Sequence, residues 1–151
     1  MKRVFKYILA ALAVLILLVA GLTLNAYLSL DRGECVQGDC ENGTGVLYFR
    51  DGTRYFGQFQ DGRIHGNGRM VSPNGESYEG QWEAARKHGH GRFVYAGGGS
   101  YLGAWEADTK QGYGTYTWGD NTKYAGQWLN GAPEGPGSLT LPDGFEMKGM
   151  Y

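Results

Sequence analysis

The chain has 151 residues, with 14 Lys or Arg against 15 Asp or Glu and a formal net charge of −1. This length allows one domain beside an N-terminal segment of different composition. From Glu34 onward, ten basic residues stand against fourteen acidic ones, a net charge of −4. Nucleic acids and anionic lipid headgroups attract clustered positive charge, so we predict no nucleic-acid partner and no purely electrostatic binding to lipid.

The first thirty residues are predicted to form a membrane anchor. Lys2, Arg3 and Lys6 make residues 1–6 a basic N-terminus, and residues 7–30 contain no charged side chain. About 20 apolar residues suffice for a helix to cross a bilayer core, so residues 7–30 are long enough for a transmembrane segment. Basic segments stay cytoplasmic, which places the rest of the chain in the periplasm or another extracytoplasmic space. We therefore expect a single-pass protein of the inner, or cytoplasmic, membrane.

A cleaved signal peptide is the alternative interpretation of this segment, because residues 19–21 or 24–26 offer a small-residue cleavage site. The apolar core of such a peptide usually has about 7–15 residues, and the stretch over residues 8–24 is longer, which favours a retained anchor. A lipoprotein signal is disfavoured because the charged Arg32 and Glu34 precede Cys35. Both remaining interpretations predict export.

Residues 31–42 are predicted to form a linker with a small cysteine loop. Cys35 and Cys40 are the two cysteines of the chain, and both follow the membrane segment. An oxidising compartment permits a disulfide between them. Unpaired thiols are one alternative and a zinc site is another. Zinc needs about four ligands, and no second cysteine pair or suitably spaced histidine pair accompanies these two, so we expect a disulfide.

Residues 43–151 are organised by a repeat of constant length, twenty-three positions from Gly43 to Gly66 and the same in each later copy. A Gly-x-Gly pair recurs at Gly43 and Gly45, Gly66 and Gly68, Gly89 and Gly91, Gly112 and Gly114, and Gly135 and Gly137. An aromatic-x-Gly-x-aromatic signature recurs at Tyr55-Gly57-Phe59, Tyr78-Gly80-Trp82, Tyr101-Gly103-Trp105 and Tyr124-Gly126-Trp128, with a degenerate copy at Met147-Gly149-Tyr151. A turn position separates the two signatures at Gly52, Gly75, Gly98, Asn121 and Gly144. The chain therefore contains about five copies of one unit.

Each copy is predicted to form a β-hairpin, because Asp-Gly or Asn-Gly between two alternating runs is a strong hairpin signal. Alternation places the glycines and rings on one face and polar residues such as Arg69, Glu79 and Gln127 on the other. Glycine between aromatics leaves room for a neighbouring ring, which can bury about 150–250 Å². We expect an all-β fold, a single elongated antiparallel sheet of repeated hairpins, preceded by one N-terminal transmembrane helix.

The repeat resembles the MORN (membrane occupation and recognition nexus) repeat. The resemblance rests on the Tyr-x-Gly-x-Trp/Phe core, the downstream Gly-x-Gly pair and the constant repeat length, and it covers residues 43–151. The Cys-x-x-Gly-Asp-Cys segment from Cys35 to Cys40 is similar to the one that precedes the repeats in bacterial members, which favours a location in the cell envelope. The resemblance implies a solenoid with a single twisted antiparallel sheet that acts mainly in binding or assembly.

Two turn positions depart from the family pattern. A glycine often follows the aromatic pair, as at Gly62 and Gly131, whereas Ala85 and Asp108 occupy the equivalent positions. The conformation of the connections between repeats is therefore open.

The rings of the repeat are the candidate core and also the candidate binding residues. They are Tyr55, Phe59, Tyr78, Trp82, Tyr101, Trp105, Trp118, Tyr124 and Trp128. Because their period coincides with that of the glycines, we expect most of them to form the core. A curved single sheet need not cover its aromatic face completely, so part of the series could line an open groove that takes a partner.

The sequence offers no catalytic, cofactor or metal site. His65 and His88 share a repeat position, and successive copies should lie about 9–10 Å apart, too far for one ion to bridge. His90 is the remaining histidine. Three carboxylates could be mistaken for an acid–base site, but they lie on the predicted polar face, where we expect them to be solvated; they are Glu76, Glu79 and Glu83. We therefore expect a protein that is not an enzyme.

Together these features predict a membrane-tethered module for protein–protein interaction or scaffolding, exposed outside the cytoplasm. Residues 7–30 would provide the membrane contact. A protein partner or a second copy would bind the aromatic groove or the edge of the sheet, where N–H and C=O groups are unpaired. The alternative function is binding of lipid or of a cell-envelope polysaccharide through the aromatic face.

Overall fold

A computed structural model describes residues 33–151, and residues 1–32 lie outside the described part. The predicted basic N-terminus (1–6) and transmembrane segment (7–30) are therefore outside the described residues. Residues 33–151 contain no helix with the length and hydropathy that a bilayer span requires. The membrane anchor remains a prediction from the sequence.

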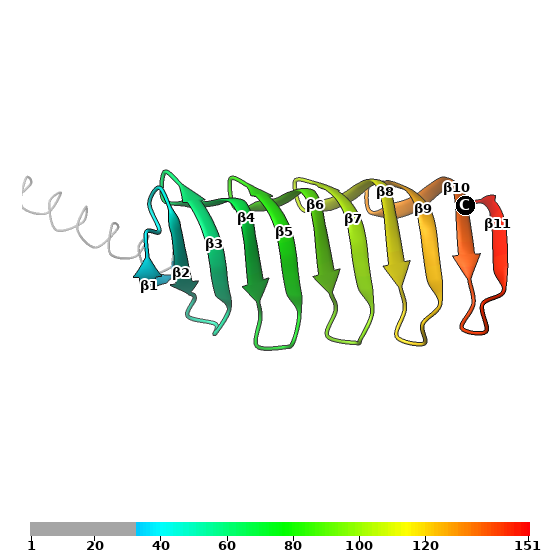
Figure 1. The fold of residues 1–151 in the computed structure, drawn as a ribbon, viewed down its shortest axis with the longest axis horizontal. Coiled ribbons are helices and arrows are strands. Elements are labelled where there is room, and N and C mark those ends of the chain that lie inside the picture. Colours follow the sequence, from blue (N-terminus) through cyan, green and yellow to red (C-terminus); the bar gives the residue numbers. More distant parts are fainter. Residues whose placement is uncertain (1–32) are drawn as a thin grey trace, which may run out of the picture. The chain divides into compact units, whose positions relative to one another are not determined.

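The described part forms one antiparallel sheet of eleven strands that lie side by side in chain order (Figure 1). Each strand pairs with its neighbours in sequence, so every connection is a hairpin. The strands are β1 (Glu34–Gly38), β2 (Thr44–Tyr48), β3 (Arg54–Gln60), β4 (Arg63–Val71), β5 (Ser77–Glu83), β6 (Arg86–Val94), β7 (Ser100–Glu106), β8 (Thr109–Thr117), β9 (Lys123–Leu129), β10 (Ala132–Thr140) and β11 (Glu146–Met150). The predicted all-β fold, a single antiparallel sheet of hairpins, is confirmed for these residues.

Two-residue turns join β3 to β4, β5 to β6, β7 to β8 and β9 to β10. Both residues of each turn have positive φ, as a type I′ turn requires. Ala85 (φ 66°) and Asp108 (φ 71°) adopt the left-handed conformation that Gly62 and Gly131 adopt at the equivalent positions. The two departures from the repeat pattern therefore leave the turn type unchanged.

Longer loops at the other ends of the strands contain the predicted turn position. Its glycines have φ between 86° and 90°, and Asn121 has φ 69°. In the loop between β8 and β9, the N–H of Asn121 donates to the carbonyl of Trp118 at 3.0 Å. The N–H of Thr122 donates to the Asp120 carboxylate at 2.9 Å. Asparagine replaces glycine here because it tolerates the left-handed backbone.

The core consists of tyrosine rings that lie across pairs of facing glycines. Gly103 on β7 faces Gly114 on β8, and the Tyr101 ring lies over both. The Trp105 ring packs edge-on against Tyr101 with centroids 5.1 Å apart, and its Nε1 donates to the carbonyl of Gly91 at 3.1 Å. Because this arrangement recurs in successive repeats, the core is a row of rings along one face of the sheet.

The edge strand β1 is held by a covalent bond. Cys35 on β1 and Cys40 in the following loop, the pair that the sequence indicates, are joined by a disulfide. Cys40 also packs against the core, whereas β1 is exposed along its length. The disulfide therefore ties an exposed edge strand to a residue that packs on the core.

Candidate interaction surface

Eight of the nine candidate aromatics are buried in the core, with exposed fractions from 0% to 6%. They are Tyr55, Phe59, Tyr78, Trp82, Tyr101, Trp105, Tyr124 and Trp128. The ninth, Trp118, is 40% exposed. These eight rings offer a partner very little surface, so the accessible surface of this face consists mainly of other residues.

Four rings of this face that are partly or fully accessible contact one another and form an aromatic stripe; they are Phe93, Tyr95, Tyr116 and Trp118. Phe93 lies on β6 and Tyr116 on β8, and the other two follow these strands directly. The ring centroid of Tyr95 is 4.6 Å from that of Phe93 and 5.6 Å from that of Tyr116. The centroids of Tyr116 and Trp118 are 4.8 Å apart. The stripe is a continuous aromatic surface that the chain itself covers only in part.

The stripe distinguishes one section of an otherwise regular sheet. Both strands that carry it, β6 and β8, contribute two rings at the same repeat positions. The equivalent residues on or after β2, β4 and β10 include only one ring; they are Leu47, Phe49, Met70, Ser72, Leu139 and Leu141. Aromatic surface is therefore concentrated on the third and fourth repeats.

Two lysines lie over the rings of the same face. Lys87 on β6 has its Nζ 5.5 Å from the ring centroid of Trp105. Lys110 on β8 has its Nζ 4.6 Å from the centroid of Trp128 and 4.9 Å from that of Tyr116. An ammonium at such distances is attracted to the negative face of a ring. Both lysines therefore add positive charge to an aromatic surface.

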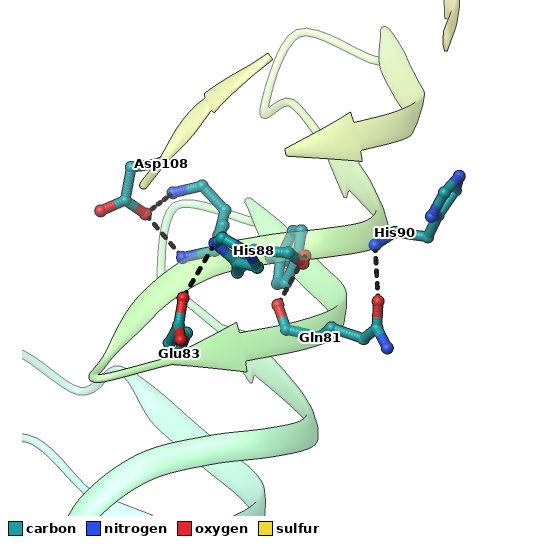
Figure 2. Close-up of polar contacts among 7 residues, drawn as sticks. Gln81, Glu83, His88, His90 and Asp108 are labelled. Atoms are coloured by element: carbon teal, nitrogen blue, oxygen red, sulfur yellow. Dashed lines mark hydrogen bonds and ion pairs between the residues drawn. The ribbon is translucent and has the colours of Figure 1, made fainter. Parts of the chain in front are cut away.

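Lys87 is paired with an acid from the next turn. Its Nζ is 2.9 Å from Oδ1 of Asp108, and its backbone N–H donates to the same oxygen at 3.0 Å. Figure 2 shows Asp108 beside β6, at the end of the strand that carries His88. Burial raises the pKa of the Asp108 carboxyl, but the hydrogen bonds and the charge of Lys87 outweigh burial and hold the pKa below its ordinary value. The pair is charged and fixed at neutral pH.

An open hollow of 310 Å³ lies between these groups. It is lined by Lys87, Phe93, Tyr95, Trp105, Asp108, Thr109, Lys110 and Gly131. Apolar walls with a few charged groups are typical of sites that orient a ligand. The hollow and the stripe together form the candidate interaction surface.

A larger hollow of 690 Å³ surrounds Phe56, whose side chain points to the opposite face of the sheet. Arg54, Arg69 and Val71 line it. These side chains are all exposed, and Phe56 itself is 60% exposed. The rings of the stripe contact one another, whereas Phe56 has no aromatic contact within residues 33–151, so the stripe is the better candidate for a defined partner.

His88, His90 and Glu83 make polar contacts at the surface of the sheet. Nδ1 of His88 is 3.3 Å from a carboxylate oxygen of Glu83, and the backbone N–H of His90 donates to Oε1 of Gln81 at 2.8 Å (Figure 2). Within residues 33–151, no three His, Cys, Asp or Glu side chains are grouped in a way that could hold a metal ion.

Sequence reasoning does not single out the two lysines. Lys87 and Lys110 occupy the position of the buried Ile64 in the next two copies of the repeat. The signal that points to these lysines is a charged residue at a repeat position where an earlier copy has an apolar, buried one. The alternation of apolar and polar residues along the strands places the rings of the stripe on the core face, but it does not predict that they stay accessible.

The MORN repeat family model matches residues 41–54, 55–77, 78–100, 101–123 and 124–145. Among solved structures, the chain is similar to the "SAS-4 (dCPAP) TCP domain in complex with a Proline Rich Motif of Ana2 (dSTIL) of Drosophila Melanogaster", with 17% identity and a TM-score of 0.47. The similarity covers 73% of this chain and 61% of that one. The chain thus matches less than two thirds of the length of that neighbour. No curated protein matches the sequence.

Proposed function

Because the chain belongs to the MORN repeat family, we propose that it is a membrane-tethered module for protein–protein interaction or scaffolding that is exposed outside the cytoplasm. MORN repeats are generally modules for protein or membrane interaction. The observation that supports a protein partner is the aromatic stripe, because contiguous apolar surface that a chain leaves uncovered often marks a partner site. The basic residues 1–6 and the uncharged residues 7–30 support the tether and its orientation.

The stripe has the properties of a preorganised binding surface. Its rings contact one another, and the Tyr116 ring also packs on buried Trp128 with centroids 6.2 Å apart. Tyr and Trp are frequent among the residues that dominate binding energy. A partner that binds rings already held in place loses less conformational entropy than one that must order them. The module would therefore bind without rearranging its sheet.

The proposed function does not include catalysis. The hollow beside the stripe contains Lys87, whose ammonium is engaged by Asp108, and Lys110. Glu79 lies 4.0 Å from Arg69 and Glu83 contacts His88; of these residues only His88 is partly buried. These pairs lack the enclosed, water-excluded setting in which acid–base groups work. Turnover that one of these substitutions abolishes would contradict this part of the proposal.

The experiment is affinity purification of the tagged full chain from membranes in mild detergent. We compare the wild type with Tyr95→Ala and Trp118→Ala, which remove rings of the stripe. Leu102→Ala is the matched control, because Leu102 is 59% exposed on the opposite face. We expect a reproducible protein partner whose binding weakens by about tenfold in the stripe variants and is unchanged in the control.

Two outcomes would contradict a protein partner at the stripe. One is equal retention of the partner by the stripe variants and the control. The other is retention of the repeats on a cell-envelope polysaccharide or on lipid vesicles, with loss in Trp118→Ala and with no protein partner. That second result would favour the alternative function through the same face. The net charge of −4 from Glu34 onward argues against an electrostatic form of lipid binding.

A further inference from the structure

Lys87 and Lys110 occupy equivalent positions in consecutive repeats, but they differ in their partners. The N–H of Asp108 donates to the carbonyl of Lys87, and the N–H of Gly131 donates to the carbonyl of Lys110, both at 3.0 Å. The two turns therefore have the same backbone contact with the preceding lysine. Asp108 places a carboxylate on Lys87, and Gly131 has no side chain to place on Lys110.

Lys110 has no carboxylate partner within residues 33–151. The ion pairs of these residues involve Lys87, Arg69, His88 and Lys148, and not Lys110. Burial lowers the pKa of the Lys110 ammonium from its ordinary value. A half-buried charge without a counter-ion is costly, and rings compensate for it only in part. The position equivalent to the Asp108 carboxylate is therefore open to an acid from another molecule.

The residues around Lys110 restrict which chemical groups can lie next to the carboxylate in the ligand. Tyr95 and Tyr116 flank the ammonium, with Nζ 5.5 Å and 4.9 Å from their ring centroids. Both lysines, Tyr95 and Gly131 line the hollow of 310 Å³. An acid that reaches Lys110 from this hollow brings its neighbouring groups onto the stripe, where apolar groups are favoured. Because the repeats carry a net charge of −4, a single carboxylate fits better than an acidic run.

We propose that Lys110 binds the carboxylate of one acidic side chain of a partner protein, whose apolar neighbours lie on the aromatic stripe. This inference rests on the proposed function and adds the chemistry of the partner. The incoming carboxylate occupies the place at Lys110 that Asp108 occupies at Lys87. Lys110 is thus a specificity-determining residue, and the rings of the stripe supply the apolar contact.

The repeat itself provides the decisive variant. Gly131→Asp gives Lys110 the internal acid that Lys87 has, and the carboxylate then competes with the partner. An aspartate at this position keeps the turn conformation, because Asp108 adopts φ 71° at the equivalent position, although a side chain at the φ of 86° of Gly131 adds backbone strain. A Cβ on Gly131 would meet Cγ2 of Thr109 at 3.9 Å, which is ordinary contact. Gly131→Asn is the matched control, with the same shape and no charge.

The probes are two blocked peptides, Phe-Glu-Phe and Phe-Gln-Phe, titrated into the full chain in detergent and followed by the NMR signals of the tryptophan indoles. We expect the Glu peptide to bind about tenfold more tightly than the Gln peptide, because the amide oxygen of Gln is a neutral acceptor and cannot form an ion pair with the Lys110 ammonium. Gly131→Asp and Lys110→Met should abolish this difference. Gly131→Asn should retain it.

Three results would overturn the inference: no binding of the Glu peptide at millimolar concentration, equal affinity for the two peptides, or a preference that Gly131→Asp leaves intact. Phenylacetate has a carboxylate and one aromatic ring but no peptide backbone, and it should bind more weakly than the Glu peptide. Equal affinity of the two would overturn the assignment to a protein segment. If stripe variants lose the purified partner while Gly131→Asp keeps it, the inference fails and the proposed function stands. If the peptides discriminate as expected but no protein partner exists, the proposed function fails.

Discussion

At the level of single residues, the fold depends on glycines that have no room for a side chain. The facing glycines Gly103 and Gly114 lie beneath the ring of Tyr101, which is fully buried. A Cβ on Gly103 would be 2.5 Å from Cα of Gly114 and 2.6 Å from the Tyr101 hydroxyl oxygen. Neither neighbour can move without shifting the sheet or the ring, so glycine is required for packing here and not for backbone freedom.

The first prediction compares two valine substitutions that share strand preference and differ in face. We expect Gly103→Val to lower the free energy of unfolding by about 1–3 kcal/mol or more, because it overpacks the core. Thr117→Val, on the opposite face of β8, should change it by no more than about 0.5 kcal/mol. Thermal and urea unfolding of both variants measure the difference. A harmless Gly103→Val together with a damaging Thr117→Val would mean that the faces are assigned in reverse.

The second prediction concerns alkaline pH. Burial raises the pKa of Tyr55 and of Tyr101 to about 12 in each case. In the unfolded chain a tyrosine titrates near its ordinary pKa of about 10, so the unfolded state binds fewer protons between these values. Stability from the neutral rings is therefore complete below about pH 10 and is lost as pH rises through about 12.

Urea unfolding at several pH values measures this loss. We expect the free energy of unfolding to fall as pH rises above about 10, and to fall less steeply in Tyr55→Phe, which has one titrating group fewer. Tyr55→Phe also loses the hydrogen bond from its hydroxyl to the carbonyl of Gln58, so the slopes are compared and not the absolute values. Identical slopes in the two proteins would contradict the assignment to Tyr55.

At the level of elements, the two-residue turns tolerate several sequences at one geometry. Ala84 and Ala85 form the turn between β5 and β6 with φ values of 48° and 66°. Alanine has a Cβ that disfavours this left-handed conformation by about 1–2 kcal/mol, whereas glycine does not. The turn is therefore strained in the third repeat and relaxed where Gly131 occupies the same position.

The third prediction follows from this difference in strain. Ala85→Gly should raise the free energy of unfolding by about 1 kcal/mol, and Gly131→Ala should lower it by a similar amount. The Cβ of the second variant makes only an ordinary contact with Cγ2 of Thr109 at 3.9 Å, so its effect reports mainly the backbone. Urea midpoints with unchanged m-values test both. If the two substitutions act in the same direction, backbone strain does not set the stability of these turns.

At the level of the whole described sheet, each hairpin contacts only its neighbours in the chain. Stability in such an arrangement is approximately a sum of repeats and their interfaces. The edge strands β1 and β11 are exposed along their full length and pair on one side only. The ends of the sheet should therefore open more readily than its middle.

The fourth prediction is a gradient of amide hydrogen exchange. Protection should be highest from β5 to β8, which have paired strands and covered rings on both sides, and should decrease toward β1 and β11. Reduction of the Cys35–Cys40 disulfide should lower protection in β1 and leave β6 unchanged. Uniform protection across all strands would instead indicate a single cooperative unit.

The fifth prediction concerns orientation. Residues 1–6 are basic and precede the uncharged residues 7–30, so a reporter fused after Tyr151 should be active only in a form that functions outside the cytoplasm. Alkaline phosphatase and green fluorescent protein fusions, made at the same site, provide opposite readouts. Fluorescence with no phosphatase activity would place the repeats in the cytoplasm and remove the basis for export.

Much of the fold can be predicted from the sequence because the same pattern of glycines, rings and turn residues occurs five times. The constant repeat length sets the hairpin, the alternation of rings with polar residues sets the faces, and the glycine or asparagine at each turn sets the connections. These features are local, since they depend on side-chain direction and backbone conformation within one hairpin. The pairing of Cys35 with Cys40 is local in the same sense.

The interaction surface could not be predicted in the same way, because it depends on contacts between different repeats and the pattern within one repeat does not describe them. Which rings are covered depends on the preceding strands: Trp128 on β9 is covered by rings that include Tyr101 on β7 and Tyr116 on β8, whereas Trp118, at the end of β8, is 40% exposed. Lys110 looks equivalent to Lys87 along the chain. Only the tertiary structure places Asp108 against one lysine and Gly131 against the other, because each turn folds back onto the repeat before it.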